Sequence, residues 1–174
     1  MKQIHQFMFI IIAISALSFT SCSSDDDGGG NGAPTSGIVT AKIDGANFSS
    51  LEITSVANKV NASSTSTLTV QGNDASGKTI ALVINGYAGE GSYDIGGPNS
   101  VAVVGSYVEV NINNPQDTQT WQAPYDSAVV GSITITEEGT GSITGNFEYT
   151  AKNPQDDSVK TITEGAFNVS LTIN

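Results

Sequence analysis

The chain has 174 residues, with 17 acidic and six basic side chains and a formal net charge of −11 at pH 7. This charge disfavours binding to nucleic acid, whose phosphates require patches of Lys and Arg. The only histidine is His5 and every basic residue is Lys, so the rest of the chain lacks the groups for Ser-His-Asp catalysis or His-ligated zinc. Carboxylate chemistry, as in glycoside hydrolysis or a calcium site, stays available. We expect a protein that is not an enzyme and holds no metal or cofactor.

The first 21 residues have the parts of a bacterial secretion signal. Lys2 supplies a positive charge, Phe7 to Phe19 is apolar apart from two serines, and the small residues Thr20 and Ser21 precede Cys22. The apolar run is shorter than the roughly 20 residues that span a bilayer as a helix. Residues 1–21 are therefore predicted to be a signal peptide rather than a membrane span.

Cys22 is the only cysteine, so no disulfide can form within the chain. The stretch from Leu17 to Cys22 resembles a bacterial lipobox, in which the cysteine is acylated and becomes the first residue of the mature chain. Ser21 fits this pattern, whereas Phe19 stands where an aliphatic residue is usual. The resemblance implies an anchor of acyl chains in a membrane, which holds stably with two or more chains. A free surface thiol is the alternative.

Residues 22–36 are predicted to be an acidic, Gly-rich tether. Ser23 to Gly32 contains no apolar side chain whose burial could offset the entropy of ordering, so we expect it to be disordered. The run from Ser24 to Gly28 resembles the acidic export signal of surface lipoproteins in the Bacteroidota. It implies a cell-surface location on the outer membrane. A plain spacer, with the protein on the periplasmic face, is the alternative.

Residues 37–174 are predicted to form a single all-β domain, because apolar residues recur with a period of two. About eight strands are expected, with 58–66 and 113–128 as loops and 92–95 as a short extended piece. The strands are predicted at 38–43, 48–56, 67–71, 79–85, 101–112, 131–136, 142–151 and 160–173. Short connections favour antiparallel pairing in a two-sheet sandwich or a flattened barrel, and we favour the sandwich.

The alternation also predicts which side chains face the core. Leu51 and Ile53 are expected to point inward, and Val104 and Val108 are expected to share the face opposite Tyr107. The clearest inward sets lie on the middle and last strands. They comprise Leu68, Val70, Ile80, Leu82, Ile84, Ile143, Gly145, Phe147, Tyr149, Ala151, Phe167, Val169, Leu171 and Ile173.

Five short motifs follow one another from Thr40 to the end of the chain. They are Ala41 to Gly45 with Phe48, Gly91 to Ile95, Gly131 to Ile135, Gly145 to Phe147 and Glu164 to Val169. Together they resemble an uncharacterised family of Bacteroidota lipoproteins of the flavobacterial type. The resemblance implies a β-rich extracytoplasmic domain, and it implies neither an activity nor a site.

Two aromatic residues on the predicted 113–128 loop suggest a ligand contact. Trp121 and Tyr125 flank Pro124 and could stack on a sugar face, with Asp117 and Asp126 beside them. A glycan or a protein segment would be the ligand. The alternative is that the loop folds over one end of the domain and buries Trp121 as a lid.

Ser127 and Ser158 each follow an aspartate and precede an apolar residue. This pattern resembles the O-glycosylation acceptor of the Bacteroidota and makes both serines candidate modification sites. The glutamates are expected to be solvated and noncatalytic, namely Glu90, Glu109, Glu137, Glu138 and Glu148.

The sequence as a whole indicates a lipid-anchored interaction domain of the cell envelope. A carboxylate-based glycan hydrolase is one alternative, for which we expect an inward pair of carboxylates in a cleft. A structural accessory of an outer-membrane complex is the other.

Overall fold

The computed structural model describes residues 35–99 and 102–174, so the predicted signal peptide and most of the predicted tether lie outside it. The domain is all-β, as expected, with eleven strands where the sequence indicated about eight. They are β1 (Ile38–Ile43), β2 (Ala46–Ser49), β3 (Val56–Ala62), β4 (Thr65–Asn73), β5 (Lys78–Tyr87), β6 (Gly91–Gly96), β7 (Val103–Glu109), β8 (Gln119–Ala123), β9 (Val129–Glu138), β10 (Ser142–Lys152) and β11 (Val159–Ile173). Three short 3₁₀ turns join them: η1 (Glu52–Thr54), η2 (Gly97–Asn99) and η3 (Pro115–Asp117). Within the described part, no helix has the length and apolar character to cross a membrane.

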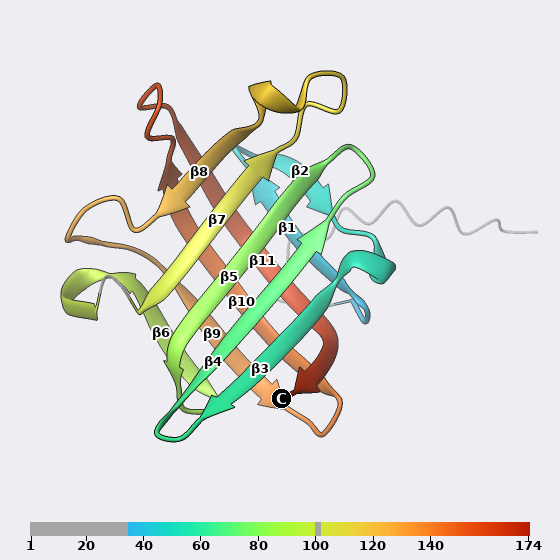
Figure 1. The fold of residues 1–174 in the computed structure, drawn as a ribbon, viewed down its shortest axis with the longest axis vertical. Helices are drawn as coiled ribbons and strands as arrows, with labels where there is room; N and C mark the ends of the chain where they lie inside the picture. Colours follow the sequence, from blue (N-terminus) through green and yellow to red (C-terminus); the bar gives the residue numbers. More distant parts are fainter. Residues whose placement is uncertain (1–34, 100–101) are drawn as a thin grey trace, which may run out of the picture. The chain divides into compact units, whose positions relative to one another are not determined.

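The strands form one sheet that closes on itself. Hydrogen bonds run in the order β11-β3-β4-β5-β7-β8-β10, and β10 pairs with β11 to complete the circuit. Figure 1 shows β3, β4, β5, β7 and β8 as a front layer that crosses over β10 and β11 behind it. The pairs β1–β2 and β9–β6 extend the back layer on either side. Of the two predicted architectures, the flattened barrel describes this closure.

The back layer meets the front layer at two forks, where a long strand changes partner. Residues 162–168 of β11 pair with β1, and residues 170–173 of the same strand pair with β3. In the same way β10 pairs with β9 up to Tyr149, and its last residue, Lys152, pairs with Gln122 of β8. The β11–β3 pair is parallel, whereas the other pairs described are antiparallel.

The sequence prediction of one strand at 48–56 is wrong, because η1 interrupts it. Leu51 is 44% exposed and Ile53 is 89% exposed, so neither faces the core as expected. The corner is held instead by two buried serines: Ser50 Oγ accepts the Val39 amide, and Ser55 Oγ donates to the Leu51 carbonyl. These hydrogen bonds between serine hydroxyls and the backbone replace the hydrogen bonds of a continuous strand, so the chain turns here.

Two predicted loops contain strands. Residues 58–66 lie mostly in the β3–β4 hairpin, and residues 113–128 contain β8. On β7, Val104 and Val108 share the face opposite Tyr107 as expected, and Tyr107 is the one that is fully buried, whereas the two valines are only partly covered. The Tyr107 hydroxyl donates to Glu109 Oε1 at 2.6 Å, which satisfies it inside the barrel. That bond lets a large polar-tipped ring take the inward position.

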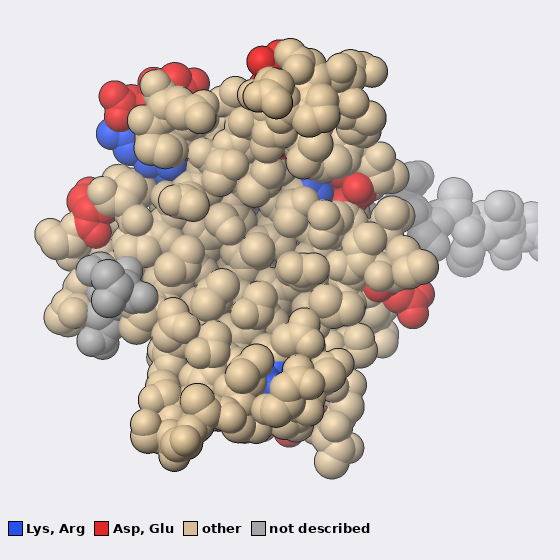
Figure 2. Space-filling model, viewed as in Figure 1, with Lys and Arg blue, Asp and Glu red and all other residues tan. Residues whose placement is uncertain are grey.

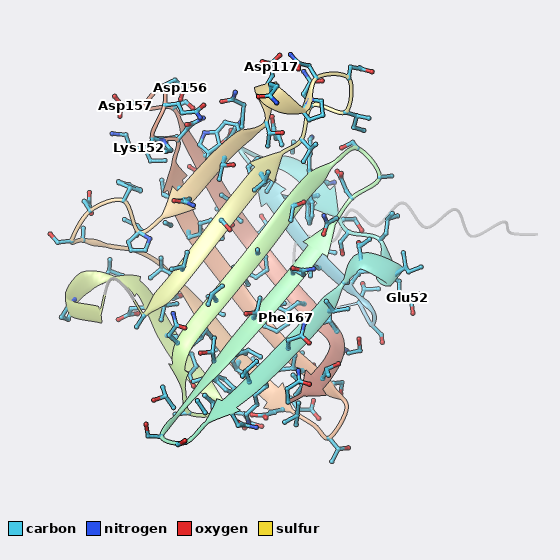
Figure 3. All side chains as sticks on the ribbon, viewed as in Figure 1. Glu52, Asp117, Lys152, Asp156, Asp157 and Phe167 are labelled. Atoms are coloured by element: carbon cyan, nitrogen blue, oxygen red, sulfur yellow. The ribbon has the colours of Figure 1, made fainter. Side chains whose placement is uncertain are left out.

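The inward sets predicted for β4, β5, β10 and β11 are confirmed, apart from Ile173, which is 49% exposed. Two of these side chains, Phe147 on β10 and Phe167 on β11, face glycines across the strand pair. Gly145 pairs with Phe167 and Gly165 pairs with Phe147. The two rings lie 6.3 Å apart, nearly parallel, and Figure 3 shows Phe167 between the layers. Each ring therefore occupies the space that a Cβ on the opposite glycine would need.

Replacing Gly165 by Ala should destabilise the barrel by about 1–3 kcal/mol, the usual cost of overpacking. The new Cβ would lie 2.5 Å from the Phe147 ring and would meet the Phe147 carbonyl oxygen. Chemical denaturation measures the free energy of unfolding. The matched control is Gly141→Ala, where a Cβ meets no atom within 4 Å. Equal stability of the two variants would contradict the proposed packing.

Candidate functional site

Trp121, the first predicted ligand contact, lies in β8 and is buried. The indole Nε1 donates to Ser158 Oγ at 2.9 Å, and Trp121 as a whole is only 5% exposed. The ring centroid is 5.6 Å from that of Tyr107, and Lys160 Nζ lies 5.4 Å from the ring centroid. Because so little of the ring is exposed, it offers no stacking face for a sugar. The structure favours the alternative, in which Trp121 closes the end of the barrel.

Tyr125 and Asp126, the next two predicted contacts, lie between β8 and β9 beside Lys152. Tyr125 is 41% exposed, and Asp126 Oδ1 accepts the Ala128 amide at 2.8 Å. Lys152 Nζ pairs with Asp157 at 2.6 Å. This ion pair raises the pKa of Lys152, and Tyr125 and Asp126 add smaller contributions of the same sign. The connection thus bridges the fork between β8 and β9 with exposed polar groups.

Asp117, the fourth predicted contact, lies on the neighbouring loop between β7 and β8. Asn114 Nδ2 donates to its carboxylate at 2.6 Å. The loop before β8 is tied to the loop between β10 and β11, because the side-chain amide of buried Asn153 donates to Gln119 Oε1 at 2.8 Å. Figure 3 shows Asp117 near the tip that carries Asp156 and Asp157. Asp117 thus precedes β8, whereas Tyr125 and Asp126 follow it, so the fold places these predicted contacts at opposite ends of the strand, and Trp121 is buried in the strand itself.

Ser127 and Ser158, the candidate modification sites, have different surroundings. Ser127 is exposed, whereas Ser158 is half-buried and accepts the Trp121 hydrogen bond. Hydrogen bonds from the side chain and the amide of Ser158 lower the pKa of Asp156. A glycan on Ser158 would have to displace these contacts, so Ser127 is the more accessible acceptor.

A second polar cluster lies at the opposite end of the barrel, where the sequence predicted solvated carboxylates. Glu138 Oε1 pairs with Lys59 Nζ at 2.7 Å, and Glu138 Oε2 accepts the Tyr87 hydroxyl at 2.8 Å. The Glu138 side chain is only 18% exposed, so the solvated prediction is wrong for this residue. Lys59 on β3 and Tyr87 on β5 belong to the front layer, and Glu138 ends β9 in the back layer.

The bonds in this cluster keep Glu138 ionised. The Lys59 hydrogen bond is the largest cause of a lowered Glu138 pKa, and the Tyr87 hydroxyl adds to it. Burial, together with Glu138, raises the pKa of Tyr87. A general acid needs a carboxyl whose pKa is raised, and Glu138 has the opposite shift. The cluster of Lys59, Tyr87 and Glu138 therefore fits a structural link between the two layers, here called the clasp, better than an acid–base pair. Among the described residues, no group of three or more His, Cys, Asp or Glu is arranged to hold a metal.

The clasp predicts a pH-dependent stability. A carboxyl whose pKa is lower in the folded than in the unfolded protein stabilises the fold when the pH is above its unfolded-state pKa. That stabilisation is lost as the pH falls through the folded-state pKa. Glu138→Gln should cost about 1–2 kcal/mol at neutral pH. The difference from the wild type should begin to shrink near the unfolded pKa of about 4.3 and should vanish once the pH is below the lowered pKa of Glu138 in the folded state. Denaturant unfolding of both proteins at a series of pH values from neutral to acidic measures this difference in the free energy of unfolding. Glu137→Gln, at the exposed neighbouring residue, is the control and should match the wild type. A constant Glu138→Gln difference at all pH values would contradict the clasp.

An open groove lies at the other fork, where β11 changes partner from β1 to β3. Its volume is about 850 Å³. The walls come from η1, the residues before β1, the start of β3, the β9–β10 turn and the middle of β11. Such a crevice follows from the topology, because two strands that leave one edge in different layers cannot close against each other.

The groove combines apolar and uncharged polar groups. Leu51, Ile53 and Val56 supply apolar surface, and Asn168 and Ser170 supply hydrogen-bonding groups along β11. Glu52 is the only charged side chain among the described residues of the lining, and Figure 3 shows it on η1. This composition suits an uncharged ligand with both polar and apolar faces, such as an oligosaccharide or an extended peptide. Sequence reasoning missed the groove, because its lining comes from separate segments with no shared motif.

The chain belongs to a protein family described as Domain of unknown function (DUF6252), whose model matches residues 35–169. That match confirms the predicted membership of an uncharacterised family. It covers nearly all of the β-domain and includes the described groove-lining residues apart from Ser170. No curated protein and no solved structure matches the chain.

Proposed function

We propose that this protein is a lipid-anchored component of the cell envelope whose β-domain binds a ligand or partner through its surface. The anchor rests on Cys22 and the segments that flank it. The interaction role rests on one observation, the open groove at the β1–β11–β3 fork. Its uncharged ligand would be a glycan or a peptide segment.

A noncatalytic role draws support from the arrangement of the carboxylates. Glu138 is held ionised by Lys59, and Glu148 points outward from β10. Of the described residues that line the groove, only Glu52 is charged. Glycoside hydrolysis needs two carboxyl groups facing one another across the scissile bond. No such pair lines the groove in the described residues, which favours binding over hydrolysis.

Anchoring can be tested with the full chain expressed in a bacterial host that processes lipoproteins. Cys22→Ala should move the protein from the membrane fraction to the soluble fraction or leave the leader uncut, since no other thiol can carry the lipid. Ser23→Ala is the control and should stay in the membrane. Mass spectrometry of the wild type should find an acylated Cys22. A bare thiol on a processed chain would contradict the anchor.

Binding in the groove can be tested with an array of neutral glycans and a panel of extended peptides. Ser170→Trp places a large ring in the groove and should weaken binding at least about tenfold, a free-energy cost near 1.4 kcal/mol. Thr172→Trp, on the same strand outside the groove, is the matched control and should bind like the wild type. Equal binding by the two variants would remove the groove as the site.

A further inference from the structure

The outer face of the front layer carries no charge. Its outward positions on β3, β4, β5, β7 and β8 hold only Val, Ala, Thr, Ser, Asn and Gln, beginning with Val56 on β3 and ending with Gln122 on β8. Figure 2 shows this face toward the viewer, with acidic and basic side chains confined mainly to the rim. In a chain of net charge −11, an uncharged face across five strands is a marked feature.

The charged residues of these five strands avoid the outer face by position. Lys78 begins β5, Glu109 ends β7 and Lys59 lies in the middle of β3, and all three are in phase with the buried side chains of their strands. Lys59 pairs with Glu138, and Glu109 accepts the Tyr107 hydroxyl. Outward side chains of a solvated sheet face are ordinarily polar and often charged, so this pattern indicates a surface suited to contact.

The outer face is also continuous, and most of its side chains are short. Asn58 pairs with Thr69, Thr69 with Val83, and Val83 with Val104, which forms a row across four strands. A second row joins Ala81 to Ser106 and Ser106 to Gln122. Short Val, Thr and Ala side chains allow two sheets to interdigitate at a spacing of about 10 Å.

We propose that this uncharged face binds a second copy of the same chain, face to face about a twofold axis. Isologous pairing is the commonest form of self-association, and it requires a surface that is complementary to itself. Two molecules of net charge −11 repel each other wherever their acidic rims meet. The uncharged face is the surface on which they can approach without placing like charges in contact.

The size of the face sets the expected strength. Five strands at about 4.8 Å spacing and about 20 Å length cover roughly 500 Å² on each copy. A pair would bury about 1,000 Å² in total, which is near the lower bound for a specific interface. We therefore expect a weak dimer that forms where the protein is concentrated. The proposal does not depend on the lipid anchor or on the groove.

The experiment uses photo-crosslinking of the full chain in cells and in their lysate. Gln71→benzoylphenylalanine places the crosslinker on the uncharged face, and Asn146→benzoylphenylalanine places it on the exposed face of β10 as a matched control. Two differently tagged copies are expressed together. Residue 71 should yield an adduct that contains both tags at twice the monomer mass, and residue 146 should not.

Val83→Glu should lower the yield of this adduct at least about tenfold, because it sets like charges against each other across the axis. Thr69→Glu, one strand away, should act in the same way and keeps the test valid if Val83→Glu does not fold. Val83→Thr should retain the adduct. Raising salt in the lysate from about 0.01 to 0.15 M should increase the yield, since salt screens the repulsion between the acidic rims.

Three results would overturn the proposal. One is the absence of a two-tag adduct from residue 71, including the case in which this residue crosslinks only to a different protein. Another is an adduct that survives both Val83→Glu and Thr69→Glu in folded chains. The third is an adduct that weakens as salt rises, which would indicate ion pairs across the interface rather than uncharged contact.

Discussion

The packing of Phe147 and Phe167 against the glycines of the neighbouring strand is the constraint on which the barrel depends. Because Gly145 and Gly165 have no Cβ, each ring can lie flat on the opposite backbone. A shift of one residue would turn the side chains of one strand to the outer face, and a shift of two could set Phe147 against Phe167. This fixes the register of β10 against β11. These are the two long strands that belong to both layers, so their register also sets where the front layer can attach.

The forks follow from that arrangement, because β10 and β11 extend beyond the residues that pair with β9 and β1 in the back layer. At one fork the β8–β9 connection crosses the gap and carries Tyr125 and Asp126. At the other fork, η1 turns aside at Ser50 and Ser55 and leaves the groove open. The same topology thus produces a filled corner and an empty one, and the empty corner is the better place for a ligand.

The sequence predicts strands well where burial is one-sided and the strand is long. β10 alternates without a break, so its span and its inward set were both read correctly. The prediction failed where distant contacts decide the outcome. Tyr107 turns inward because Glu109 satisfies its hydroxyl, and Glu138 is drawn into the barrel by Lys59, 79 positions away in the sequence. The groove has no local signal at all, since separate segments form it, whereas the loops around Trp121 were marked by their aromatic residues.

The distribution of charge explains why recognition would rely on uncharged surfaces. Lys42, Lys59, Lys152 and Lys160 each form an ion pair within the domain. With these cations engaged, the free charge at the rim is largely acidic, and it disfavours anionic partners at every approach. Uncharged surfaces can offer shape, hydrogen bonds and apolar contact to a neutral partner. The groove at the β11 fork and the outer face of the front layer are the surfaces that offer them. The two surfaces adjoin at Val56, which lines the groove and begins the outer face on β3, so a second copy on the front face would border a ligand in the groove.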